Sequence, residues 1–240
     1  MPSFMLQVIS YWGIRDPVST MTHLLGALAA LAATVVLVRR ARRAGHKGRA
    51  VTVYGVCVVL ALAASATFHL VDATSPRFTL FHKIDHAAIF LVVAGTGTAI
   101  YESIGARWSD VLIAATWVVN LTAIVVKLLL WPVTPWLTAT IYVSVGWTSS
   151  AGLGVVVPAA RWHRLYHFLV GMVVLTLGAV VFVTEWPNPW PGVIEAHEVF
   201  HMLVLIGLGY HGCFVYQHCT GRSAWADLAD YDDADEMHSA

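Results

Sequence analysis

Charged residues are scarce in this chain of 240 residues, because Asp, Glu, Lys and Arg make up only 12% of it against 58% hydrophobic residues. Soluble domains carry about twice that share of charge, so the composition excludes an ordinary soluble protein. Basic and acidic residues both number 14, and without a basic patch nothing indicates a nucleic-acid partner. There are three cysteines, an odd number, and their spacing follows no pairing pattern, which argues against a disulfide framework.

Two other patterns are missing. No segment alternates polar and apolar residues as a membrane barrel strand would, and no cleavable signal peptide precedes the first apolar run. Seven apolar runs are present instead, each near the roughly 20 residues that cross a bilayer core. The sequence therefore predicts an all-α membrane protein, a bundle of seven transmembrane helices. The expected spans are residues 20–38, 50–70, 84–101, 111–131, 136–157, 165–183 and 196–216.

The chain is expected to form one transmembrane unit with short ends. Residues 1–19 make an N-terminal lead, residues 20–218 the seven-helix domain, and residues 219–240 an acidic tail that we expect to be disordered. Ser19 or Thr20 is placed to cap the first helix.

The spans at 111–131 and 136–157 carry few ionisable groups and are expected to be scaffold. Lys127 is the exception, and its long side chain is expected to reach toward the outer surface. In the third span, Gly95 and Gly97 lie inside an apolar segment, which indicates close helix packing and not a phosphate-binding loop.

Basic residues divide unequally between the two sides of a seven-helix arrangement. Six of them lie in residues 39–49, and ten lie in loops and tail on that side. The other side has three, namely Arg15, Arg77 and Lys83. Because basic residues in short loops stay cytoplasmic, we expect a multi-pass plasma (inner) membrane protein with its N-terminus outside and its C-terminus inside.

Three histidines are candidates for a metal site. His197 and His201 are four residues apart, so on a helix they share one face and can reach one ion. His69 is expected at the same membrane depth, because the second span ends and the last span begins at the outer side. Three imidazoles leave one position of a tetrahedral zinc open, which is typical of catalytic sites.

Asp85 is the carboxylate most out of place, since a charge near the hydrocarbon costs a few kcal/mol unless it is paired or faces a polar cavity. It is therefore a functional candidate. The alternatives are that it caps its own helix or pairs with Lys83. Ser65, one turn before His69, can bond to a water or to a substrate oxygen.

Other histidines are weaker candidates. His82 adjoins the interface, and His86 points about 100° away from Asp85 on a helix, although either could be a ligand. His23 enters the membrane alone and is expected to be a hydrogen-bonded bundle residue or a support for a polar site.

Taken in order, these residues resemble the hemolysin III family, within the superfamily of progestin and adiponectin receptors and alkaline ceramidases. The chain departs from the usual pattern at residues 97–99, where Gly-Thr-Ala replaces Tyr-Thr-Pro and a helix kink is expected to be lost. The resemblance rests on Asp16-Pro-X-Ser19, Thr22-His23-X-X-Gly26, Ser65-X-X-X-His69, Lys83-Ile-Asp85-His86, Ala94-Gly-Thr96 and His197-Glu-X-Phe-His201.

The resemblance implies that His69, His197 and His201 bind zinc and that Asp85 and Ser65 hold or polarise a water. It also implies hydrolysis of a lipid amide, such as ceramide, taken from the bilayer. The residue types suit this task. Zinc lowers the pKa of a bound water from about 15.7 to about 7, and a carboxylate can then accept a proton and pass it to a leaving group.

Three other functions remain open. Residues 197–201, His-Glu-Val-Phe-His, match the short motif of zinc proteases, in which Glu198 would be the base. The bundle could also be a zinc-stabilised receptor without catalysis. A cytolytic pore is the third alternative, although it would need a polar stripe along several helices, and the fourth to sixth spans show none.

Overall fold

The protein is all-helical in the part that the computed structural model describes, which is residues 13–46, 48–220 and 225. Within those ranges no β-strand occurs, and one isolated bridge joins Trp190 and Ile194. The predicted all-α class is confirmed for these residues. The helices are α1 (Pro17–Arg43), α2 (Arg49–Leu70), α3 (Phe78–Ile104), α4 (Ser109–Leu129), α5 (Pro135–Ser150), α6 (Leu153–Val156), the 3-10 helix η2 (Ala159–Leu165), α7 (Tyr166–Thr184) and α8 (Ala196–His218).

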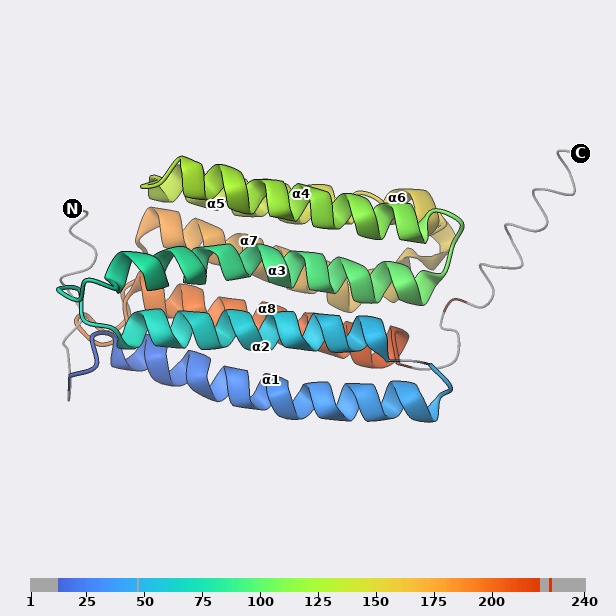
Figure 1. The fold of residues 1–240 in the computed structure, drawn as a ribbon, viewed down its shortest axis with the longest axis horizontal. Helices are drawn as coiled ribbons and strands as arrows, with labels where there is room; N and C mark the ends of the chain where they lie inside the picture. Colours follow the sequence, from blue (N-terminus) through green and yellow to red (C-terminus); the bar gives the residue numbers. More distant parts are fainter. Residues whose placement is uncertain (1–12, 47, 221–224, 226–240) are drawn as a thin grey trace, which may run out of the picture.

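The long helices run side by side along one axis (Figure 1). Helices α1 to α4 pack each against the next, α7 packs against α8, and α5 contacts both α3 and α7. Helix α8 also packs against α1 and α3, which closes the bundle. This return places the first turns of α8 beside the end of α2.

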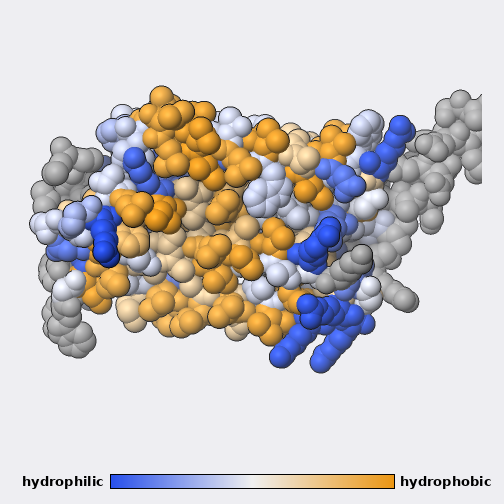
Figure 2. All heavy atoms as spheres, in the orientation of Figure 1, coloured by the Kyte–Doolittle hydropathy of each residue, from blue (hydrophilic) through white to orange (hydrophobic). Residues whose placement is uncertain are grey.

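Six helices are long and apolar enough to cross a membrane, namely α1, α2, α3, α4, α8 and the segment Arg161–Thr184 that contains α7. Their outward side chains are apolar, and Leu25 and Leu28 of α1 are 60% and 56% exposed. Figure 2 shows hydrophobic residues over the middle of the molecule and hydrophilic residues gathered toward its ends. Such a band suits lipid and not water, so this is a multi-pass membrane protein.

The fifth predicted span is not one continuous helix. Helix α5 ends at Ser150, and α6 is a separate single turn. The Tyr101 hydroxyl donates to the Ser149 carbonyl at 2.8 Å, the group that would bond to the Leu153 amide in an unbroken helix. A β-carbon at Gly152 would lie 2.9 Å from the same hydroxyl. Tyr101 therefore ends α5 early.

Two helices begin earlier than predicted. Helix α1 starts at Pro17, so Ser19 and Thr20 lie inside its first turn and neither caps it. Ser19 bonds to Glu198 across the bundle. Helix α3 starts at Phe78. Its start places Asp85 two turns inside the helix, which contradicts the alternative that Asp85 is an N-terminal cap.

Close packing at the third span's glycines is confirmed. A β-carbon at Gly95 would lie 3.0 Å from Cys57, and one at Gly97 would lie 2.9 Å from Thr116. Helix α3 continues without a break through residues 97–99, as expected without the proline.

The prediction that Lys127 reaches the outer surface is wrong. Its side chain is 2% exposed and lies between α4 and α5, where its ammonium donates to the Thr138 hydroxyl at 2.9 Å. Of the tail predicted to be disordered, residues 221–224 and 226–240 lie outside the described residues. Thr220 and Trp225, which are described, are buried.

Candidate metal centre

The three candidate histidines meet at one end of the bundle. His69 lies in the last turn of α2, while His197 and His201 lie in the first turns of α8, and one ring nitrogen from each lies within 4.8 Å of the others. The Nε2 atoms of His69 and His197 are 3.3 Å apart. Zinc–nitrogen bonds of about 2.0–2.1 Å put two ligands of a tetrahedral site about 3.3 Å apart. The three histidines could therefore hold one metal ion.

The protein around this cluster limits how its rings can move. His69 and His201 are 2% and 3% exposed. His23 of α1 stacks on His201 with ring centres 4.0 Å apart and nearly parallel planes. The sequence anticipated a supporting role for His23, and the contact is a ring stack against a candidate ligand.

Asp16 and Arg15 support His69 from the segment before α1. The Asp16 carboxylate lies 2.7 Å from His69 Nδ1 and 2.8 Å from the Arg15 guanidinium. Burial raises the pKa of Asp16, but the bond to His69 and the charge of Arg15 outweigh it and hold that pKa below its usual value. With Nδ1 bonded to a carboxylate, Nε2 of His69 is left for a metal, as in many zinc sites.

Asp16 and Arg15 were not recognised as site residues from the sequence. In the sequence, Asp16 enters only as part of the Asp16-Pro-X-Ser19 motif and Arg15 only in the charge count. A usable signal was present, because Asp16 directly precedes a membrane helix at the end where His69 was expected. The same segment also bonds to the end of α2, since the Asp16 amide donates to the His69 carbonyl at 3.2 Å.

A cavity of about 320 Å³ extends from the histidine cluster into the bundle. Asp85 and Ser65 both line it, and Ser65 lies within hydrogen-bonding reach of Asp85. Asp85 takes part in no ion pair within the described residues, and Lys83 lies over the Trp131 ring at 5.7 Å. The alternative Lys83 pair is therefore not formed.

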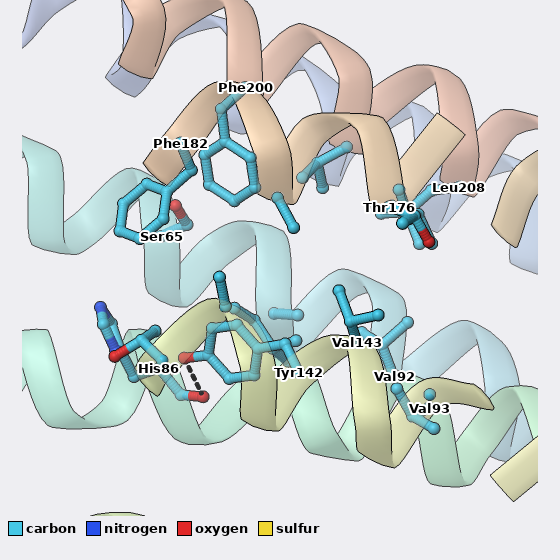
Figure 3. Close-up of a pocket in the computed structure, with 18 of the residues that line it drawn as sticks. Ser65, His86, Val92, Val93, Tyr142, Val143, Thr176, Phe182, Phe200 and Leu208 are labelled. Carbon is cyan, nitrogen blue, oxygen red and sulfur yellow. Dashed lines mark hydrogen bonds between the residues drawn. The ribbon is translucent and has the colours of Figure 1, made fainter. Parts of the chain in front are cut away.

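The cavity has a polar end and apolar walls. Figure 3 shows Ser65, Phe182 and Phe200 on one side, facing His86 and Tyr142 on the other. The Tyr142 hydroxyl donates to the His86 carbonyl at 3.2 Å, so α5 is joined to α3 next to Asp85. Farther in, aliphatic side chains such as Val92 and Leu208 line the walls.

Glu198, which lies between the two α8 histidines in the sequence, helps to hold the structure together. It is 1% exposed, and its two carboxylate oxygens accept from the Ser19 hydroxyl at 2.9 Å and from the Glu195 amide at 3.0 Å. With Glu195 it forms a capping box that begins α8. Both oxygens are therefore engaged in holding the helix start and α1.

His82 and His86 do not join the cluster. The His82 ring is parallel to Phe68 at 4.5 Å and meets Trp131 edge-on at 4.7 Å. The His86 ring lies edge-on to His82 at 4.5 Å and packs near Trp131. These two histidines are part of an aromatic layer that lines the cavity, and the cluster of possible ligands does not include them.

Known proteins match most of this chain in sequence. A family model described as haemolysin-III related matches residues 11–212, a range that includes every histidine and carboxylate of the cluster. A curated protein named Hemolysin-3, from Bacillus cereus, is 26% identical over 161 residues. That alignment covers 66% of this chain and 69% of the Bacillus protein.

Proposed function

The chain belongs to the haemolysin-III related family, a part of the superfamily named for progestin and adiponectin receptors, and on this premise we propose that it is a zinc-dependent hydrolase of lipid amides. One observation carries the proposal. A three-histidine cluster opens onto a cavity whose far walls are apolar. That combination suits a substrate with a polar, hydrolysable group and an acyl chain.

The donor set favours zinc among the metals that imidazole binds. Three nitrogen ligands with an open fourth position are typical of catalytic zinc, whereas a structural zinc is usually closed by a fourth protein ligand. His69, His197 and His201 would hold the ion, and Asp16 would orient His69. When bound, zinc supplies a Lewis acid and makes a water acidic enough to ionise near neutral pH.

The chain's own residues have separate tasks in this proposal. Asp85 accepts a proton from the attacking water and delivers it to the leaving amine. Ser65 holds Asp85 or a substrate oxygen in place by a hydrogen bond. The apolar walls bind the acyl chain, so the substrate lipid enters from the bilayer with its polar group toward the histidines.

We place this site toward the outer face of the plasma membrane, with α5 and α6 together completing a seventh span. The unequal loop charges support this orientation. A reporter fused after Ala240 should score as cytoplasmic, and an extracytoplasmic signal would overturn the orientation.

The three alternative functions have requirements that differ from those of the proposed hydrolase. A protease that used Glu198 as its base would need a free carboxylate there, whereas both oxygens bond to other parts of the chain. A non-catalytic receptor or a cytolytic pore would need no proton acceptor at Asp85.

Release of fatty acid from a labelled ceramide-like lipid tests the proposal. Purified protein should release it, and Asp85→Asn should reduce release to background while zinc stays bound. Equal background release from both proteins, across a panel of lipid amides and esters, would favour a receptor or a pore.

A further inference from the structure

Lys127 is a buried cation in the membrane-spanning part of the bundle. Its side chain is 2% exposed, and its ammonium donates to the Thr138 hydroxyl at 2.9 Å. It also lies over the rings of Tyr142, at 5.1 Å, and Trp131, at 5.9 Å. Aromatic faces attract a cation but do not cancel its charge.

No carboxylate compensates this charge within the described part of the chain. The ion pairs found there join Asp16 to Arg15 and to His69, far along the sequence from Lys127. A buried charge is unfavourable unless it has a partner of opposite sign. An ionisable residue at membrane depth is therefore a candidate for binding a ligand.

Thr138 connects Lys127 to the cavity. It is 2% exposed and lines the cavity wall. Other cavity threonines, such as Thr96 and Thr176, donate their hydroxyl to the carbonyl four residues earlier, each at 2.8 Å. Thr138 instead accepts from Lys127, and no acceptor for its own proton is found among the described residues. A hydroxyl that accepts from an ammonium is also a stronger donor.

Thr138 lies at the same end of the bundle as the candidate site. It lies in the first turn of α5, one turn before Tyr142, whose hydroxyl bonds to the carbonyl of His86 next to Asp85. Figure 3 shows Tyr142 across the cavity from Ser65, so Thr138, on the same helix, belongs to the α5 side of the cavity. A ligand group there would lie at the same end of the cavity as the start of α3, which carries Asp85.

We propose that Lys127 and Thr138 form an anion-recognition pair, and that the lipid amide has a carboxylate on its headgroup, as an N-acyl amino acid does. The carboxylate accepts from Thr138 and compensates the charge of Lys127. The amide part of this assignment rests on the proposed function, whereas the preference for a carboxylate is a property of binding and does not need turnover.

Two ligands that differ only in charge test the pair. N-oleoylglycine and N-oleoylglycinamide share the acyl chain and the amide, but one ends in a carboxylate and the other in a neutral amide. Binding is measured with the full chain in vesicles of phosphatidylcholine. N-oleoylglycine should bind about tenfold more tightly, the size expected for one hydrogen bond to a charged group.

Variants then assign the preference to these residues. Lys127→Met and Thr138→Val should each remove the preference, so that the two ligands bind alike, and Lys127→Arg should restore part of it. Lys83→Met is the matched control, because Lys83 also lies over Trp131 but does not bond to Thr138 as Lys127 does. It should keep the full preference.

Three results would overturn the pair. These are equal binding of the two ligands, a preference that survives both Lys127→Met and Thr138→Val, and oleate binding as tightly as N-oleoylglycine, which would assign the carboxylate to the product. Fatty acid release is assayed separately. A charge preference without release contradicts the proposed function alone, and release without a charge preference contradicts the anion pair alone.

Discussion

Two of the chain's three pairs of histidines spaced four residues apart enclose a carboxylate. His197 and His201 on α8 enclose Glu198, while His82 and His86 on α3 enclose Asp85. In the α8 pair the histidines belong to the candidate site, and in the α3 pair the carboxylate does. The α8 pair converges with His69 but its carboxylate caps the helix, whereas the α3 pair packs among aromatic rings but its carboxylate faces the cavity.

This difference shows what helical spacing determines. A separation of four residues puts two side chains on one face, but the neighbouring helices decide what that face meets. The α8 face meets His69 and His23, while the α3 face meets Phe68 and Trp131. The proposed enzyme therefore takes its metal ligands from one pair and its proton acceptor from the other.

Removing the rings of each pair should give the largest contrast. His197→Ala with His201→Ala should eliminate zinc, because one remaining ligand cannot hold it. The expected loss of affinity exceeds the roughly 100-fold that a supporting residue contributes. His82→Ala with His86→Ala should keep about one zinc per chain, measured by metal analysis of purified protein. Retention of zinc by the α8 variant would contradict the assignment.

Exchanging the Asp85 carboxylate for an amide should have the next largest effect. Asp85→Asn should lower fatty acid release by about 10²–10⁴-fold, the usual contribution of general acid–base catalysis. Zinc content and the unfolding temperature should stay near those of the wild type. Loss of zinc in this variant would show that Asp85 is a ligand and not the proton acceptor.

The carboxylate behind the metal cluster should have an intermediate effect. Asp16→Asn weakens the partner of His69 Nδ1, so zinc affinity should fall about 10–100-fold, measured by competition with a chelator. Asp72→Asn is a matched control, because Asp72 is exposed and bonds only to Thr74 in its own turn. Equal affinities in the two variants would remove the supporting role of Asp16.

Glu198→Gln should have the smallest effect and should change stability instead of turnover. It removes a charge from the start of α8 and weakens the bonds to Ser19 and to the Glu195 amide, at a cost of about 1 kcal/mol. The thermal midpoint should drop slightly while release of fatty acid persists. A loss of release as deep as that of Asp85→Asn would instead support the protease motif.

Much of the site could be predicted from sequence because its parts are local. The spacing of His197 and His201 and the apolar runs on which they lie depend on neighbours within a few residues. The bond of Asp16 to His69 and the bond of Ser19 to Glu198 do not follow from spacing, since each joins segments more than 50 residues apart. Spacing cannot report such contacts.

The same limit explains the two errors in the scaffold. Hydropathy predicted one helix through residues 136–157, but the Tyr101 hydroxyl donates a hydrogen bond to a backbone carbonyl of that segment. The sequence also predicted that the Lys127 side chain would reach toward water. In the folded bundle, Thr138 and two aromatic rings surround it. In both places a side chain from another helix decided the outcome.

X-ray absorption spectroscopy at the zinc edge of the purified wild-type protein tests the central claim most directly. We expect one zinc per chain with three nitrogen ligands and one oxygen ligand, all at about 2.0–2.2 Å. Absence of zinc, or a shell that contains sulfur at about 2.3 Å, would contradict a catalytic centre built from His69, His197 and His201.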